Sequence, residues 1–74
     1  MNLSDAKIND KLKIVNIADD GVKTRLYRMG LKIGSAVTVF AVAPFGTPIG
    51  VKFGNIRLAI SKKTAEKITV QKYD

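Results

Sequence analysis

Residues 29–61 read MGLKIGSAVTVFAVAPFGTPIGVKFGNIRLAIS, and this stretch decides the fold. It contains three runs rich in β-branched and aromatic residues that are separated by glycine and proline, a pattern typical of consecutive strands. The last two runs flank Gly54-Asn55, a dipeptide that favours a two-residue hairpin turn because both residues can adopt a positive φ. The stretch therefore predicts three consecutive antiparallel strands.

The turn also fixes which residues of the hairpin face one another. One side of the hairpin is predicted to be an apolar wall made of Phe53 with Ile56, Val51 with Leu58, and Ile49 with Ile60. On the other side Lys52 faces Arg57, and facing like charges cost a little stability. Two interpretations of this pair stay open: the charges splay into water, or an acidic partner neutralises both.

The strand before the hairpin ends in a proline-rich loop. Alternation in residues 36–43 predicts an inner face of Val37, Val39 and Ala41 and an outer face of Thr38, Phe40 and Val42. Residues 43–48 follow as a rigid loop with Phe45 near its tip, which either packs back onto the domain or stands exposed as an anchor for another protein. The predicted buried set is Val37, Val39, Val51, Phe53, Leu58 and Ile60.

The first strand is predicted to change face along its length. In residues 11–17, Leu12 and Ile14 alternate regularly, whereas Val15 and Ile17 continue in the opposite phase. A strand with such a change is bulged or sharply bent, as the strands of small barrels are at their corners.

A helix is predicted to follow this strand. Asp19-Asp20-Gly21 marks its start, and an apolar stripe at helical spacing consists of Val22, Leu26 and Met29. Gly30 suits the left-handed residue after the helix, with Leu31 folding back onto Leu26.

Both ends of the chain are predicted to carry short helical turns. Residues 3–8 predict one turn with Ser4 as its N-cap and Leu3 packed on Ile8. Ser61 is the expected N-cap of a second turn over residues 62–67, before a last strand that ends near residue 72. The pattern as a whole predicts a mainly β fold, a small SH3-like barrel of about five strands with one short α-helix after the first strand.

Length and composition limit the function. The chain has 74 residues, which predicts a single domain over residues 1–74, and it contains no histidine or cysteine. No apolar run reaches the roughly 20 residues that cross a bilayer, and residues 1–5 lack the pattern of a signal peptide. We therefore expect a cytoplasmic protein, and the net charge of +7 favours solubility or an acidic partner.

The residue types argue against catalysis and against a metal centre. Without histidine or cysteine, neither general acid–base or nucleophilic chemistry nor tight binding of Fe(II) or Zn(II) is expected, and no cofactor motif occurs. A nucleic-acid surface needs aromatic residues interleaved with cations, and the sequence does not predict such an alignment. A binding module is the remaining class.

The chain resembles a known family at two motifs in one register, Met29-Gly30-Leu31-x-x-Gly34 and Ala43-Pro44-x-Gly46-x-Pro48-Ile49. Together with residues 25–28, 37–39, 58–60, 65 and 68–70 they are similar to the FeoA family, ferrous iron transport protein A. The resemblance implies a small cytoplasmic SH3-like barrel of bacteria that works with FeoB, the membrane iron transporter with a cytosolic G-domain. It implies a regulatory or scaffolding role through protein–protein contact.

Three hypotheses follow. The preferred one is a non-enzymatic accessory protein of ferrous iron uptake that contacts the FeoB-type transporter and reaches the membrane only through it, with no nucleic acid expected as a partner. The alternatives are a basic nucleic-acid-binding barrel and a metal-responsive domain related to the C-terminal domains of iron-dependent repressors. A weak homo-oligomer stays open. The candidate partner-binding residues are Arg25, Leu26, Arg28, Pro44, Phe45, Pro48, Lys52 and Arg57.

Overall fold

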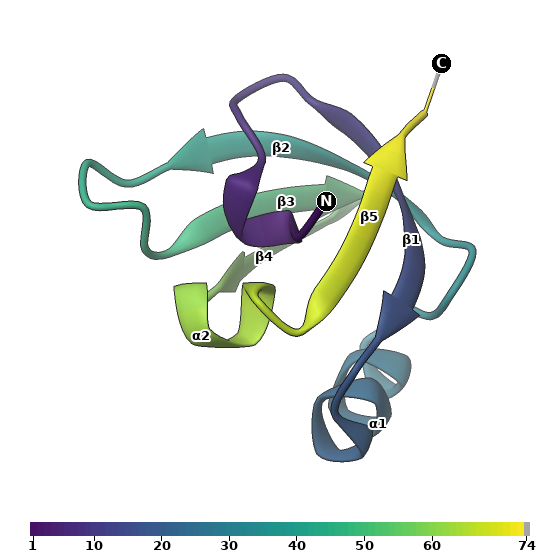
Figure 1. Cartoon of the computed structure of the whole chain (residues 1–74). Helices are drawn as coiled ribbons and strands as arrows, with labels where there is room; N and C mark the ends of the chain where they lie inside the picture. The colour runs from purple at the N-terminus through teal and green to yellow at the C-terminus, as the bar shows by residue number, and fades with distance from the viewer. Residues whose placement is uncertain (74) are drawn as a thin grey trace.

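One antiparallel sheet of five strands is the main element of the fold, and it curves around the core (Figure 1). The computed structural model describes residues 1–73. The elements in chain order are η1 (Leu3–Asp5), β1 (Lys11–Ile17), α1 (Asp20–Arg28), β2 (Ala36–Val42), β3 (Ile49–Phe53), β4 (Ile56–Ile60), α2 (Lys62–Ala65) and β5 (Ile68–Lys72). The strands lie side by side in the order β4-β3-β2-β1-β5. The predicted mainly β class, with one helix after the first strand and helical turns near both ends, is confirmed.

The hairpin of β3 and β4 has the predicted register, from Ile49 opposite Ile60 to Phe53 opposite Ile56. Gly54 has a φ of 58°, whereas Asn55 does not have a positive φ. A glycine alone with positive φ at the first turn position is the arrangement of a type II′ turn, which suits the twist of a hairpin.

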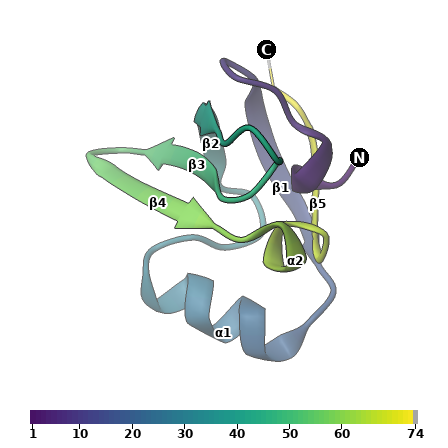
Figure 2. The same cartoon turned by 90° about the vertical axis from the view of Figure 1, so that its left-hand side faces the viewer.

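The apolar wall of this hairpin is less buried toward its tip than predicted. Ile56 is 48% exposed, and Phe53 and Leu58 are only half-buried against the core. Figure 2 shows the reason: the tip of the hairpin projects beyond the other strands, so its last residues have no element to cover them. The other four residues of the predicted buried set are buried: Val37, Val39, Val51 and Ile60.

Two bulges shape the sheet. The predicted irregularity of β1 lies between Ile14 and Asn16, in the pairing with β5. A second bulge, which the sequence did not predict, lies between Val39 and Ala41 in the pairing of β2 with β3. It reverses the expected faces at the end of β2, because Ala41 lies opposite Gly50 and Val42 packs against the core opposite Ile49.

Helix α1 is capped at both ends as predicted. At its start the Asp19 side chain accepts a hydrogen bond of 2.9 Å from the N–H of Val22. At its end Gly30 has a φ of 96°, and the N–H of Leu31 donates to the carbonyl of Leu26 over 2.9 Å. Together with the bond from the Gly30 N–H to the Tyr27 carbonyl, this is a Schellman motif, which satisfies carbonyls at the helix end.

The N-terminal segment differs from the prediction. Asn2, not Ser4, precedes the short helix η1, and its side chain makes no capping hydrogen bond. Leu3 is buried in the core, whereas Ile8, its expected contact, is 53% exposed. The reason is that the segment pairs with β5 instead of folding on itself: the N–H of Val70 donates to the Met1 carbonyl over 2.7 Å.

The second helical turn is correctly predicted at its start and is shorter than expected. The Ser61 hydroxyl caps α2 by accepting a bond from the N–H of Thr64, and the helix ends at Ala65 instead of continuing to residue 67.

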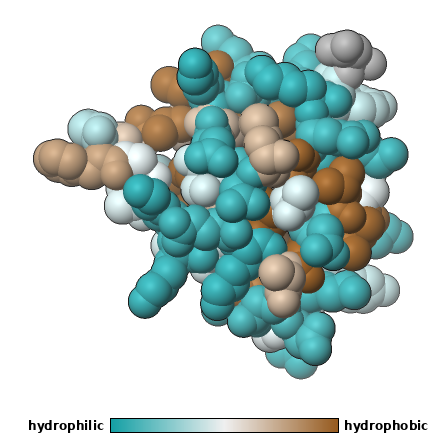
Figure 3. Space-filling model, in the orientation of Figure 1, coloured by the Kyte–Doolittle hydropathy of each residue, from teal (hydrophilic) through white to brown (hydrophobic). Residues whose placement is uncertain are grey.

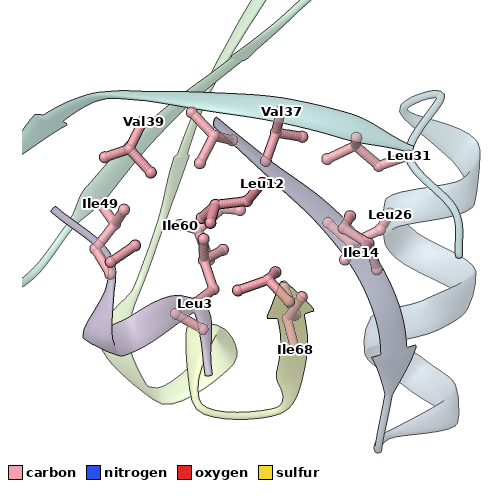
Figure 4. Close-up of a cluster of buried hydrophobic side chains, with 14 of the residues drawn as sticks. Leu3, Leu12, Ile14, Leu26, Leu31, Val37, Val39, Ile49, Ile60 and Ile68 are labelled. Atoms are coloured by element: carbon pink, nitrogen blue, oxygen red, sulfur yellow. The ribbon is translucent and has the colours of Figure 1, made fainter. Parts of the chain in front are cut away.

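A single apolar cluster fills the concave side of the sheet. Side chains from β1, β2, β3, β4 and β5 meet those from η1 and α1, and the labelled ones point toward one another (Figure 4). Among residues 1–73 no charged or polar residue is buried. The interior is therefore occupied by packing, and any function of this domain resides on its surface.

Candidate functional site

The candidate docking features of the described residues lie on the surface. No group of three or more His, Cys, Asp or Glu side chains there could hold a metal ion. No helix in this part of the chain is long and apolar enough to cross a membrane. The candidate residues from the sequence fall on three surfaces: the loop between β2 and β3, the outer face of the hairpin, and α1.

The loop of residues 43–48 presents Phe45 to solvent. Its side chain is 91% exposed, the most exposed of the large apolar residues in the described chain. Of the two fates predicted for this residue, the structure shows the exposed one. In Figures 1 and 3, which share one orientation, the loop projects at the left, and the end of this projection is apolar.

Hydrogen bonds hold the loop at its base and at its turn. The Ala43 N–H donates to the Pro48 carbonyl over 3.2 Å, and the Gly46 N–H donates to the Ala43 carbonyl over 2.8 Å. The Thr47 hydroxyl accepts a bond of 3.1 Å from the N–H of Lys62, which ties the loop to the start of α2. Pro44 and Pro48, in the same loop, are also exposed, so the loop is an ordered apolar projection.

The outer face of the sheet carries a row of cations. Lys52 lies beside Arg57, as predicted, and beyond Lys52 the row continues through Thr38 on β2 to Lys11 on β1. The guanidinium of Arg57 lies 5.5 Å from the ring centre of Phe40, within the range of a cation–π interaction.

A shallow groove of about 430 Å³ lies along this row. Its lining includes Lys11, Lys52 and Tyr73. The expectation that aromatic residues do not align with cations is therefore wrong for this face, which holds both Phe40 and Tyr73. The sequence signal was present for Phe40, which alternates onto the face of Lys52, but absent for Tyr73 beyond the last strand.

Helix α1 contributes fewer exposed candidate residues to the surface than predicted. Arg25 and Arg28 are exposed, but Leu26 is 2% exposed in the core and does not reach the surface. This correction follows from the helical stripe itself, since Leu26 belongs to the face that packs on the sheet. A surface that the sequence did not reveal is a groove of about 280 Å³ whose lining includes the exposed Tyr27 and Ile33.

The three surfaces do not form one site. Figure 1 shows the loop between β2 and β3 at the opposite end of the molecule from α1. The cation row lies on the outer face of the sheet, whereas α1 packs against the core on the inner side. A partner that contacts all the candidate residues would have to wrap around the domain.

Two carboxylates are held by the fold. The N–H of Lys7 and the ammonium of Lys72 both donate to Asp10, and these bonds lower the pKa of its carboxyl group. The pKa of Asp19 is lowered by the bond from the Val22 N–H and by Lys67 at 3.2 Å. Both groups cap or tie elements of the fold, so neither is a candidate acid or base for catalysis.

With the geometry in place, comparison with known proteins decides the family. The sequence matches the profile of the FeoA domain over residues 1–72. This chain belongs to the FeoA family.

Solved structures agree with this FeoA assignment. The FeoA protein of Chlorobium tepidum is 33% identical, with a TM-score of 0.90 over 100% of this chain and 71% of that one. A crystal structure of an iron uptake regulatory protein, FeoA, is also 33% identical, with a TM-score of 0.85 over 99% of this chain and 96% of its own. No curated protein sequence matches closely enough to add to these comparisons.

A third FeoA structure confirms the SH3-like architecture. The zinc complex of Stenotrophomonas maltophilia FeoA is 26% identical, with a TM-score of 0.79 over 96% of this chain and 89% of that one. That protein is described as an SH3 domain protein and as a candidate activating factor of bacterial ferrous iron transport. The manganese regulator SloR shares the fold at 14% identity and a TM-score of 0.86.

Proposed function

We propose that this FeoA-family chain is a non-enzymatic accessory protein of bacterial ferrous iron uptake. It acts by binding the cytosolic part of a FeoB-type membrane transporter. Family membership supports the iron-transport setting, and the ordered loop with an almost fully exposed Phe45 is the observation that carries the contact.

Phe45 has the properties of an interface anchor. An exposed aromatic side chain gains the most when a partner removes it from water, and aromatic residues dominate binding energy at interface centres. The loop is held by three hydrogen bonds, from the N–H groups of Ala43, Gly46 and Lys62. It is therefore already ordered before binding, which lowers the entropy cost of association. Lys62 and Lys63 beside the loop add attraction to an acidic partner.

The test is the affinity of the chain for the cytosolic part of the transporter, measured with and without guanine nucleotide. Phe45→Ala is expected to weaken binding by more than about tenfold, the loss typical of an anchor residue. Ile8→Ala is the matched control, because Ile8 is an exposed apolar residue elsewhere on the surface. Wild-type chain that shows no binding in either nucleotide condition would refute the proposal.

One observation favours a second candidate function, the binding of single-stranded nucleic acid. The outer face combines Phe40 and Tyr73 with the cations Lys11, Lys52 and Arg57, and stacking aromatics beside cations are what such a surface needs. Affinity for an oligothymidine would then fall steeply with salt, and Tyr73→Ala would weaken it. An oligothymidine that does not bind even at low salt removes this candidate.

A further inference from the structure

The sheet ends in two edge strands, and within the described chain only one of them pairs with a further segment. Beside the middle of β5, Met1 and Asn2 form an isolated antiparallel bridge: the Val70 N–H donates to the Met1 carbonyl, and Asn2 lies opposite Thr69. The other edge is β4, which pairs with β3 alone (Figure 2).

The free backbone groups of β4 can be assigned from the turn. A two-residue hairpin closes on a hydrogen-bonded pair, here Phe53 with Ile56, and such pairs alternate along the ladder. Leu58 and Ile60 therefore also bond to β3, whereas the N–H and C=O groups of Arg57 and Ala59 point away from the sheet. Within the described chain no hydrogen bond reaches these groups.

The usual protections of an edge strand are weak here. Strand β4 contains no proline, its register with β3 has no bulge, and Ile56, Arg57 and Ala59 are all exposed. Natural edge strands are usually protected from pairing by a proline, a bulge or charged side chains, or they are covered by another element. A single arginine remains as the barrier to pairing.

We propose that the β4 edge is a β-strand addition site for an extended, acidic segment of the partner protein. This inference rests on the proposed function and specifies how the transporter's cytosolic part is held: a segment of it becomes the next strand beside β4. Main-chain hydrogen bonds to Arg57 and Ala59 supply affinity, and the side chains that alternate along the segment supply specificity.

The residues around the edge define what the segment must carry. Its residue beside Arg57 lies on the outer face, where Lys52 is the neighbour on β3, so a carboxylate there neutralises both cations. Its residues beside Ile56 and Leu58 lie on the inner face, where apolar side chains cover the exposed end of the hairpin wall. The expected pattern is a carboxylate flanked on both sides by apolar residues.

A second copy of this chain fits the edge less well. Antiparallel pairing of two β4 strands about Leu58 would bring both Lys52–Arg57 pairs close to the symmetry axis, with no acidic residue on either β3 or β4. Each chain also carries a net charge of +7. Charge therefore favours an acidic partner over self-association.

The first test removes one free donor and leaves the fold in place. Ala59→Pro deletes an N–H that faces solvent, and proline is tolerated at such positions of edge strands. Ala59→Val keeps the N–H and is the matched control. Affinity for the transporter's cytosolic part is expected to fall about tenfold or more for the proline variant and to stay within about twofold of wild type for the valine variant.

A second measurement uses the unaltered chain. On binding, the amide protons of Arg57 and Ala59 are expected to become protected from exchange, while the solvent-exposed amides of α1 stay unchanged. Arg57→Glu is expected to weaken binding and to reduce its salt dependence strongly, whereas Lys7→Glu, an equal charge change at an exposed site away from β4, is expected to have a smaller effect.

The outcomes separate the two proposals. If wild type binds the transporter but neither amide is protected and Ala59→Pro binds normally, the strand-addition site is wrong while the accessory function stands. If wild type does not bind the transporter, both fall. Sedimentation that shows a dimer disrupted by Ala59→Pro would assign the edge to a second copy and overturn the acidic segment.

Discussion

The β5 edge and the β4 edge of the sheet differ in what lies beyond them. At β5 the chain supplies its own cover, because Met1 and Asn2 pair with the strand and the neighbouring Leu3 is buried in the core. At β4 the hairpin runs past the core, and the wall of apolar residues opens to solvent at Ile56. In the described part of this small domain, the fold pairs a further segment with β5 at Thr69 and Val70, whereas β4 has no further strand beside it.

The first prediction concerns a substitution that weakens the N-terminal segment beside β5. Leu3 is 2% exposed and fixes the N-terminal segment against the core. Leu3→Ala is expected to lower the free energy of unfolding by about 2–5 kcal/mol, the usual cost of removing a buried leucine side chain. A domain of this size has roughly 4–11 kcal/mol in total, so denaturant melts should shift strongly. A loss below about 1 kcal/mol would show that the segment is not part of the folding unit.

The second prediction concerns the same type of substitution, leucine to alanine, in the edge strand β4. Leu58 on β4 is half-buried against the core, so part of its side chain already contacts water. Leu58→Ala is expected to cost about 1–2 kcal/mol, less than Leu3→Ala, because less apolar area is lost and a smaller cavity remains. Denaturant melts of both variants under one condition give the comparison. Equal losses would mean that both edges are equally integrated in the core.

The contrast between the edges also marks what the sequence could and could not predict. The hairpin register, the Schellman end of α1 and the bulge in β1 depend on neighbouring residues, and each was predicted. The pairing of Met1 with Val70 depends on main-chain groups at opposite ends of the chain, and main-chain groups carry no sequence signal. The bulge of β2 was missed because apolar residues fill both faces at the end of that strand, so alternation gives no phase.

The surface residues divide in the same way into features that neighbouring residues determine and features that distant contacts determine. The neighbouring positions of Lys52 and Arg57 follow from the turn and were predicted. Alternation predicted the face of Ile56 but not its depth, because a pattern does not say how far a hairpin extends beyond the core. The exposure of Phe45 stayed undecided in the sequence, since a loop aromatic packs back or projects according to contacts that are distant in the chain.

The last prediction, which has the smallest expected effect, concerns the loss of folding stability at low pH. The described ion pairs lie on the β5 side of the molecule: Lys72 with Asp10 joins the end of β5 to the start of β1, and Lys67 with Asp19 joins the approach to β5 to the start of α1. The pKa of each carboxyl lies below its ordinary value of 3.8 because it accepts a backbone N–H bond and faces a lysine. Each group therefore contributes stability above pH 3.8 that is lost as the pH falls through its folded pKa.

Thermal unfolding from neutral pH to about pH 2 measures this loss, with Asp10→Asn and Asp19→Asn as the variants. Asparagine still accepts the backbone hydrogen bonds, since it caps as well as aspartate does, but it does not titrate in this range. Each variant is expected to lose slightly less thermal stability than wild type below pH 3.8. Because both carboxylates are exposed, the effect is small. Acid profiles that coincide for all three proteins would show that these two ion pairs contribute nothing measurable to stability.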